Sequence, residues 1–171
     1  MGNKDARRYP VISLGAEHLV IGHLLRRNIL TYKTPPNNEG YDLICIHPNP
    51  RDPRRNNALI RIQVKSRYQT DCDRAFPLKE KSFGAFDYLI IAFLNNGYYY
   101  KKHSVREGFK EPVFYTLPLE FLKKHHQTAK SGWERVLTKG LDDEMEPYKN
   151  ERGFEIIATK LGIPYPGTES N

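Results

Sequence analysis

The sequence predicts an α/β domain in which helices flank a central β-sheet. Three observations support this class. Apolar and polar residues alternate over 59–66, residues 86–94 are almost continuously apolar, and apolar residues recur at helical spacing over 13–27. The chain of 171 residues suits a single domain, 1–171, because 39% of its residues are hydrophobic and can form a core.

The composition favours a polyanionic partner. The net charge is +7 and the isoelectric point is about 9.4, a balance typical of proteins that bind nucleic acid, although an ordinary basic protein has it too. The two cysteines have no partner at metal-ligand spacing, so we expect a reduced, cytoplasmic protein without structural zinc. The sequence has no signal-peptide segment and no run long enough to span a membrane, so no membrane partner is expected.

The first predicted element is a helix that Ser13 caps and that runs to about Arg27. Glu17 falls on its apolar stripe, where a carboxylate is costly unless a partner compensates it. Two interpretations are open: Glu17 faces inward toward a ligand, or it lies at the edge of the stripe and reaches water, His18 or Arg26. The stripe itself consists of Leu14, Ile21, Leu24 and Leu25.

Two strand-like segments follow, and they bring three polar residues together. In 59–66 the alternation turns Gln63 and Lys65 to one face and the apolar residues to the other. In 40–46, Asp42 lies at the start of the strand. If the two strands form a hairpin, Asp42 comes close to Gln63 and Lys65. A carboxylate, an amide oxygen and an ammonium at one edge of a sheet suit a hard divalent cation and a phosphate.

The connection between these strands, 47–58, cannot be regular structure because prolines and asparagines interrupt it. Its arginines, Arg51, Arg54 and Arg55, are candidates for contacts with DNA phosphates, and a solvated hairpin loop is an equally good interpretation. The apolar run 86–94 predicts a central strand that is buried on both faces. Further along, the sequence predicts a strand over 113–117 and helices over 119–126 and 154–161.

The order of these elements resembles the PD-(D/E)XK nuclease superfamily, which includes restriction endonucleases and archaeal Holliday-junction resolvases. The resemblance covers about 13–126, the nuclease-like core, and leaves about 127–171 as a C-terminal extension. It implies a restriction-endonuclease-like mixed central sheet flanked by helices. There are two departures from the family pattern. Tyr41 replaces the proline, and Gln63 replaces the usual acidic residue, as in some transposon-end endonucleases.

The resemblance implies a metal-dependent endodeoxyribonuclease with Glu17, Asp42, Gln63 and Lys65 as its catalytic residues. Glu17, Asp42, Gln63 and the carbonyl of Val64 would bind Mg²⁺ or Mn²⁺, which lowers the pKa of a bound water. Lys65 would orient that water and stabilise developing charge. Just past the strand, Ser66 and Arg67 would contact neighbouring DNA phosphates.

Three functional interpretations compete. The first is a Mg²⁺-dependent DNA endonuclease, which Glu17, Asp42 and Lys65 together favour. The second is a catalytically inactive nucleic-acid-binding domain of the same fold, which Gln63 favours because it removes a charge from the site. The third is a basic interaction domain in which Asp42 and Lys65 form a surface pair of little energetic value. A homodimer would suit paired cuts on two DNA strands.

Overall fold

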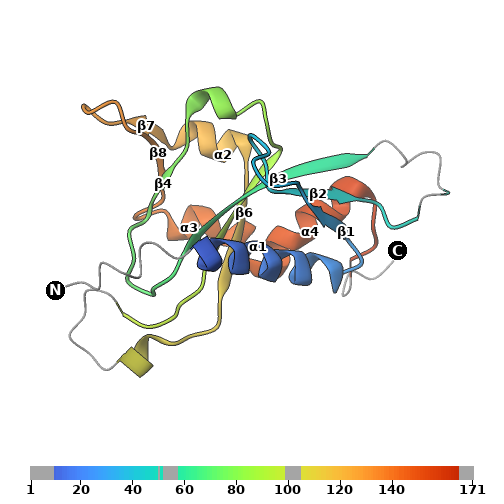
Figure 1. Ribbon diagram of the computed structural model, residues 1–171, viewed down its shortest axis with the longest axis horizontal. Coiled ribbons are helices and arrows are strands. Elements are labelled where there is room, and N and C mark those ends of the chain that lie inside the picture. Colours follow the sequence, from blue (N-terminus) through green and yellow to red (C-terminus); the bar gives the residue numbers. More distant parts are fainter. Residues whose placement is uncertain (1–9, 50, 52–57, 99–104, 166–171) are drawn as a thin grey trace.

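The computed structural model describes residues 10–49, 51, 58–98 and 105–165. Its main sheet has five strands in the order β1-β2-β3-β5-β6 (Figure 1). The strands β3 and β5 pair in parallel and the other neighbours pair antiparallel, so the sheet is mixed as expected. The strands of this sheet are β1 (Leu30–Lys33), β2 (Leu43–Ile46), β3 (Leu59–Arg67), β5 (Tyr88–Phe93) and β6 (Val113–Pro118).

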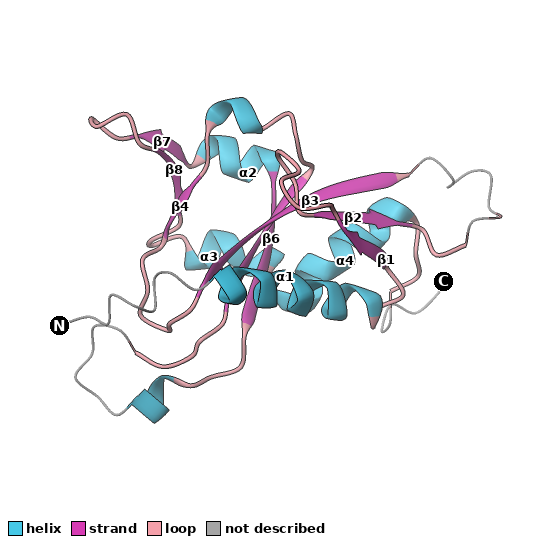
Figure 2. Cartoon of the chain, viewed as in Figure 1, coloured by secondary structure: helices cyan, strands magenta, loops and turns pink. Residues whose placement is uncertain are grey.

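A second, smaller sheet has three strands in the order β4-β8-β7 and lies beside α2 (Figure 2). Its strands are β4 (Ala75–Pro77), β7 (His126–Thr128) and β8 (Glu134–Leu137). The α-helices are α1 (Pro10–Leu25), α2 (Leu119–Lys124), α3 (Asp142–Met145) and α4 (Asn150–Leu161). Short 3-10 helices occur at η2 (Glu80–Ser82), η3 (Val105–Gly108) and η4 (Glu146–Tyr148). No helix in the described ranges has both the length and the apolar character that a membrane span requires.

Two apolar clusters hold these layers together, one on each face of the main sheet. On one face, α1 and α4 pack against the sheet, and on the other face α2 and the small sheet do so. The strand β5 serves both clusters: Ile90 points to the first, whereas Leu89 and Ile91 point to the second. This explains why residues 86–94 are almost continuously apolar and confirms that their strand is buried on both faces.

The predicted apolar stripe of the first helix is only partly correct. Leu24 is fully buried and Ile21 packs against the same cluster, but Leu14 and Leu25 are 43% and 46% exposed, and Ala16 and Val20 are buried instead. The helix also begins at Pro10, earlier than the predicted Ser13 cap. Because α1 is apolar around most of its circumference, spacing alone could not identify the buried face. Small Ala16 allows the helix to approach the sheet closely, and its neighbour Glu17 lies at the flank of the buried stripe.

The C-terminal segment contributes to the core of the main sheet. The helix α4 packs against β6 and β3, and its Phe154, Ile157 and Leu161 belong to the same cluster as the buried face of α1. An ion pair between Arg27, just after α1, and Glu151 in α4 joins the two helices. Residues far apart in the sequence therefore form one continuous layer on this face.

Candidate functional site

Asp42 is fixed at the point where β2 and β3 begin to pair. Its backbone N–H donates to the carbonyl of Ile62 at 2.8 Å, and its carboxylate Oδ2 accepts the N–H of Val64 at 2.7 Å. Leu43 pairs with Ile62, and this register places Asp42 opposite Gln63. The predicted hairpin geometry is thus confirmed, because Asp42 lies next to the segment that carries Gln63 and Lys65.

The four predicted catalytic residues line one hollow of about 340 Å³. The strand β3 supplies most of its wall, α1 supplies one side, and Asp42 comes from the start of β2. Because Gln63 and Lys65 alternate with buried Ile62 and Val64, both polar side chains reach the surface of the hollow. The predicted residues that line it are Glu17, Asp42, Gln63, Val64, Lys65, Ser66 and Arg67, and Ser13 and Pro77 complete it.

Glu17 forms an ion pair with Lys33, the last residue of β1. The Glu17 side chain is 16% exposed and that of Lys33 is 33% exposed, so the pair lies partly inside the protein. Of the alternatives left open by the sequence, pairing with His18 or Arg26 is not what the structure shows, because the partner of Glu17 is Lys33. Sequence reasoning missed Lys33 because it is 16 residues from Glu17 and comes near it only through the packing of α1 on β1.

The side chains of Gln63 and Lys65 have no partner among the residues that the structure describes. In the described part of the chain, neither side chain forms a hydrogen bond or an ion pair, and both are half-buried. An amide oxygen and an ammonium that are held in a hollow without partners can interact with a ligand there. This distinguishes the two residues from Glu17, whose charge Lys33 already matches.

Arg67 lines the same hollow, but its guanidinium already bonds to backbone carbonyls of the protein. Its guanidinium donates to the carbonyls of Asp73 at 2.9 Å, Ser66 at 3.1 Å and Ala75, and it lies 4.4 Å from the ring centroid of Phe76. Burial lowers the pKa of Arg67. These contacts anchor the end of β3 to β4, and contact between DNA and Arg67 stays a prediction.

Among the described residues of the 47–58 connection, Arg51 does not line the hollow. Arg51 is exposed, and its backbone N–H donates to the side chain of Asn49 at 3.0 Å. It belongs to the connection between the end of β2 and the start of β3, at the end of the hairpin away from Asp42 (Figure 1). Arg54 and Arg55 lie outside the described residues.

The donor atoms of the hollow suit a hard cation. Glu17 and Asp42 supply carboxylates, and Gln63 and Val64 supply neutral oxygens, which are the ligand types that Mg²⁺ and Mn²⁺ accept. The described residues contain no group of three or more His, Cys, Asp or Glu side chains that could hold a metal. Gln63 contributes a neutral amide, so the carboxylates that line this hollow are those of Glu17 and Asp42.

A second hollow of about 420 Å³ lies next to the first, because Gln63 and Lys65 line both. Lys79 and Trp133 line its opposite side. Trp133 is 39% exposed, and the guanidinium of Arg135 lies 4.7 Å from the centre of its ring. Sequence reasoning did not assign this surface to the site, because only the packing of the small sheet brings Trp133 near β3.

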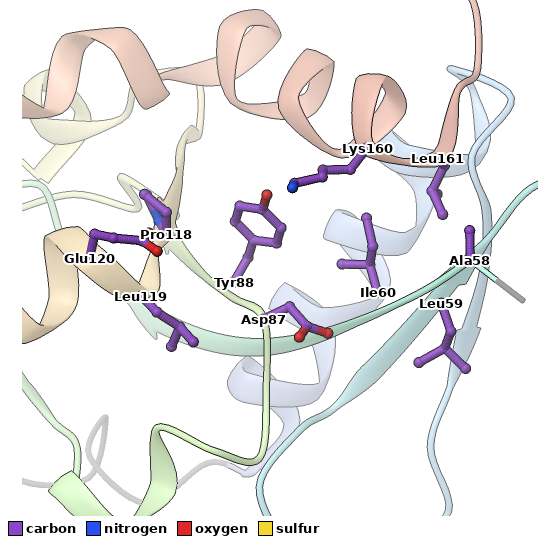
Figure 3. Close-up of a pocket in the computed structure, with 10 residues that line it drawn as sticks. All are labelled: Ala58, Leu59, Ile60, Asp87, Tyr88, Pro118, Leu119, Glu120, Lys160 and Leu161. Carbon is purple, nitrogen blue, oxygen red and sulfur yellow. The ribbon is translucent and has the colours of Figure 1, made fainter.

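A larger hollow of about 500 Å³ lies beyond the other end of β3 (Figure 3). Asp87 is its most constrained polar residue. The carboxylate of Asp87 accepts the backbone N–H of Arg61 at 2.7 Å and two guanidinium bonds at 3.0 and 3.2 Å. Burial alone would raise the pKa of Asp87, but the hydrogen bonds and charge of Arg61 together lower it. The remaining polar groups, Tyr88, Glu120 and Lys160, surround an otherwise apolar wall.

Comparison with solved structures bears on the fold. No family model matches the chain, and no curated protein matches it. A solved structure described as that of a bacterial homing endonuclease, I-Ssp6803I, is similar over 95% of this chain and 96% of that chain, with a TM-score of 0.51 and 14% sequence identity. The similarity includes most of the C-terminal segment, since 95% coverage cannot omit residues 127–171. At this identity the comparison shows that the two chains share a fold.

Proposed function

We propose that the protein is a Mg²⁺-dependent DNA endonuclease of the PD-(D/E)XK type. The observation that carries this proposal is the convergence of Glu17, Asp42, Gln63 and Lys65 in one hollow. The net charge of +7 and the shared fold with a homing endonuclease support DNA as the substrate. Mn²⁺ is an alternative ion, because it accepts the same oxygen ligands.

Hydrolysis of a phosphodiester requires a water to attack phosphorus while one P–O bond breaks. Bound metal would polarise the phosphate and lower the pKa of the attacking water. Glu17, Asp42, the Gln63 amide oxygen and the Val64 carbonyl would hold it. Asp42 is suited to this role because its bond to the Val64 N–H fixes its orientation and leaves its Oδ1 available to a ligand.

Lys65 has a separate role in the proposed reaction. Its ammonium would orient the attacking water and stabilise the negative charge that develops on the phosphate oxygens. The absence of a protein partner for this side chain in the described ranges supports the role, since a salt bridge would have to break first. Ser66 and Arg67, which also line the hollow, would contact adjacent phosphates, as would Arg51, Arg54 and Arg55 along the duplex.

The test is incubation of supercoiled plasmid and four-way branched DNA with Mg²⁺ or Mn²⁺, with and without chelator. We expect metal-dependent cleavage that the chelator abolishes and that Lys65→Ala abolishes too. A homodimer would release linear plasmid early, because two active sites would cut both strands, whereas a monomer would accumulate nicked plasmid. Light scattering would give the oligomeric state independently.

The second candidate is a catalytically inactive nucleic-acid-binding domain. Gln63 favours it, because a neutral amide replaces a carboxylate that would attract the metal. In that case the protein would bind DNA with an affinity that falls steeply as salt rises, but it would not cut with either ion. Cleavage by the wild type that is lost in Lys65→Ala would exclude this candidate.

A further inference from the structure

The ion pair between Lys33 and Glu17 lies at the proposed metal site. Lys33 ends β1, which pairs with β2, and the backbone N–H of the next residue, Thr34, donates to the carbonyl of Asp42 at 2.9 Å. The ends of β1 and β2 are thereby held together. Glu17 reaches the same place from α1. Lys33 is not part of the sequence motif, yet its ammonium pairs with Glu17, a carboxylate that the motif assigns to the metal.

The charges around the hollow already have a positive sum without any metal. Glu17 and Asp42 carry one negative charge each, and Lys33, Lys65 and Arg67 carry one positive charge each, so their sum is +1. A divalent cation would add two positive charges close to two ammonium groups, with no third carboxylate to compensate. The phosphate of a bound DNA supplies a negative charge in the same place.

We propose that Lys33 couples metal binding to DNA binding. In the protein without DNA, Lys33 holds Glu17 in an ion pair and opposes entry of the cation. When DNA binds, a backbone phosphate takes over the Lys33 ammonium, and Glu17 becomes a metal ligand. Lys33 is thus a positioning residue that acts through Glu17. The inference rests on the proposed function, since it assumes that the hollow binds metal and a phosphodiester.

Linkage requires that the effect be reciprocal. If DNA raises the affinity for metal by some factor, metal raises the affinity for DNA by the same factor. Loss of the Lys33 charge should reduce this coupling equally for both ligands, because it tightens metal binding to the DNA-free protein. Affinity for metal in the DNA complex should change less, because there the ammonium has already left Glu17.

The experiment is calorimetric titration of Mn²⁺ and Mg²⁺ into the full chain, without DNA and with a phosphorothioate duplex that resists cleavage. Lys33→Gln should bind metal roughly tenfold more tightly than the wild type in the absence of DNA, because one opposing charge is removed. In the presence of DNA, the difference in metal affinity between Lys33→Gln and the wild type should become smaller. Lys33→Arg, which keeps the charge, should resemble the wild type. Lys123→Gln, an equal charge change on exposed α2, serves as the matched control.

The outcomes separate this inference from the proposed function. Equal metal affinity of Lys33→Gln and the wild type without DNA, including no binding by either, would overturn the role of Lys33. If the wild type nevertheless cleaves DNA with metal, the endonuclease proposal stands without it. Adding Glu17→Gln to Lys33→Gln should abolish the gain, and a gain that persists would show that Lys33 does not act through Glu17. Thermal unfolding of each variant confirms that the proteins compared are folded.

Discussion

The strand β3 carries two polar clusters that differ in how completely their charges are matched. Arg61 is paired with Asp87, with 3.0 Å between its guanidinium and the carboxylate, and the same carboxylate also accepts a backbone N–H. Four residues later on the same side of the strand, Lys65 has no partner among the described residues. The two hollows at the ends of this strand therefore differ in whether their charged groups are paired within the protein, although carboxylates and lysines line both.

The pair of Arg61 and Asp87 therefore has a structural role, whereas the ammonium of Lys65 is available to a ligand. The bonds of Asp87 to Arg61 connect the start of β5 with β3, and the Asp87 carboxylate accepts three hydrogen bonds from this one residue. Lys65 contributes no such bond, so the fold does not require its charge. The larger hollow is therefore the weaker functional candidate, because its best-placed carboxylate already serves to hold two strands together.

The largest expected effect is that of Lys65→Ala on cleavage. We expect a loss of roughly a thousandfold or more in the cleavage rate at saturating DNA, because the proposed function assigns Lys65 the stabilisation of the transition state. The unfolding temperature should not change, since Lys65 has no partner to lose among the described residues. Lys160→Ala in the larger hollow is the matched control and should cleave normally. Single-turnover gel assays measure both variants, and equal activity of the two would contradict the distinction between the hollows.

Asp87→Ala should have the converse effect. Loss of the carboxylate leaves the N–H and guanidinium of Arg61 without their acceptor, which should cost about 1–3 kcal/mol of unfolding free energy. The folded protein should still cleave DNA. Urea denaturation measures the stability, with Glu120→Ala as a control from the same hollow. An unchanged unfolding free energy would show that the pair is a solvent-exposed contact of little value.

Gln63→Glu should tighten metal binding to the DNA-free protein by about tenfold, because a carboxylate attracts a hard cation more strongly than an amide does. Cleavage need not become faster, since the new charge also repels the scissile phosphate. Calorimetry measures the affinity, and Gln127→Glu, which adds the same charge to exposed β7, should leave it unchanged. If neither the wild type nor Gln63→Glu binds metal, even with DNA, the hollow is not a metal site.

Trp133 offers a smaller and more local test of the surface next to Lys65. Because the chain has a single tryptophan, its fluorescence reports on this hollow alone. We expect DNA to quench the emission and Trp133→Leu to weaken DNA binding several-fold, with Trp133→Phe closer to the wild type because an aromatic ring can stack on a base. Emission that does not respond to saturating DNA would place the DNA elsewhere.

The smallest expected effect is on the pH dependence of stability, and it concerns a second ion pair, that of Arg27 and Glu151. The hydrogen bond from Arg27 lowers the pKa of Glu151 to about 2 from its usual 4.5. A depressed carboxylate pKa stabilises the folded state fully above about pH 4.5, and this contribution is lost as the pH falls toward 2. Melting temperatures between pH 2 and 6 should therefore fall less steeply for Glu151→Gln than for the wild type. Parallel curves would mean that the pair does not contribute, and Glu155→Gln is the control.

The sequence was most informative where local patterns decide the structure. Alternation along β3 placed Gln63 and Lys65 correctly, because each side chain of a strand points opposite to its neighbours. Spacing predicted only part of the buried face of α1, namely Ile21 and Leu24, since a helix that is apolar nearly all round has no unique buried face. The Lys33 contact and the position of Trp133 depend on packing between distant segments, for which these single-sequence patterns gave no signal.

The bond between the Asp42 carboxylate and the Val64 N–H has a consequence for the way related sequences are interpreted. It ties Asp42 to the register of β2 on β3, and a slip of one residue would turn Gln63 and Lys65 into the core. Selection for a folded chain alone can therefore retain Asp42 after cleavage has been lost. Lys65 has no comparable duty among the described residues. Among related sequences, retention or loss of Lys65, rather than of Asp42, would therefore distinguish active nucleases from inactive ones.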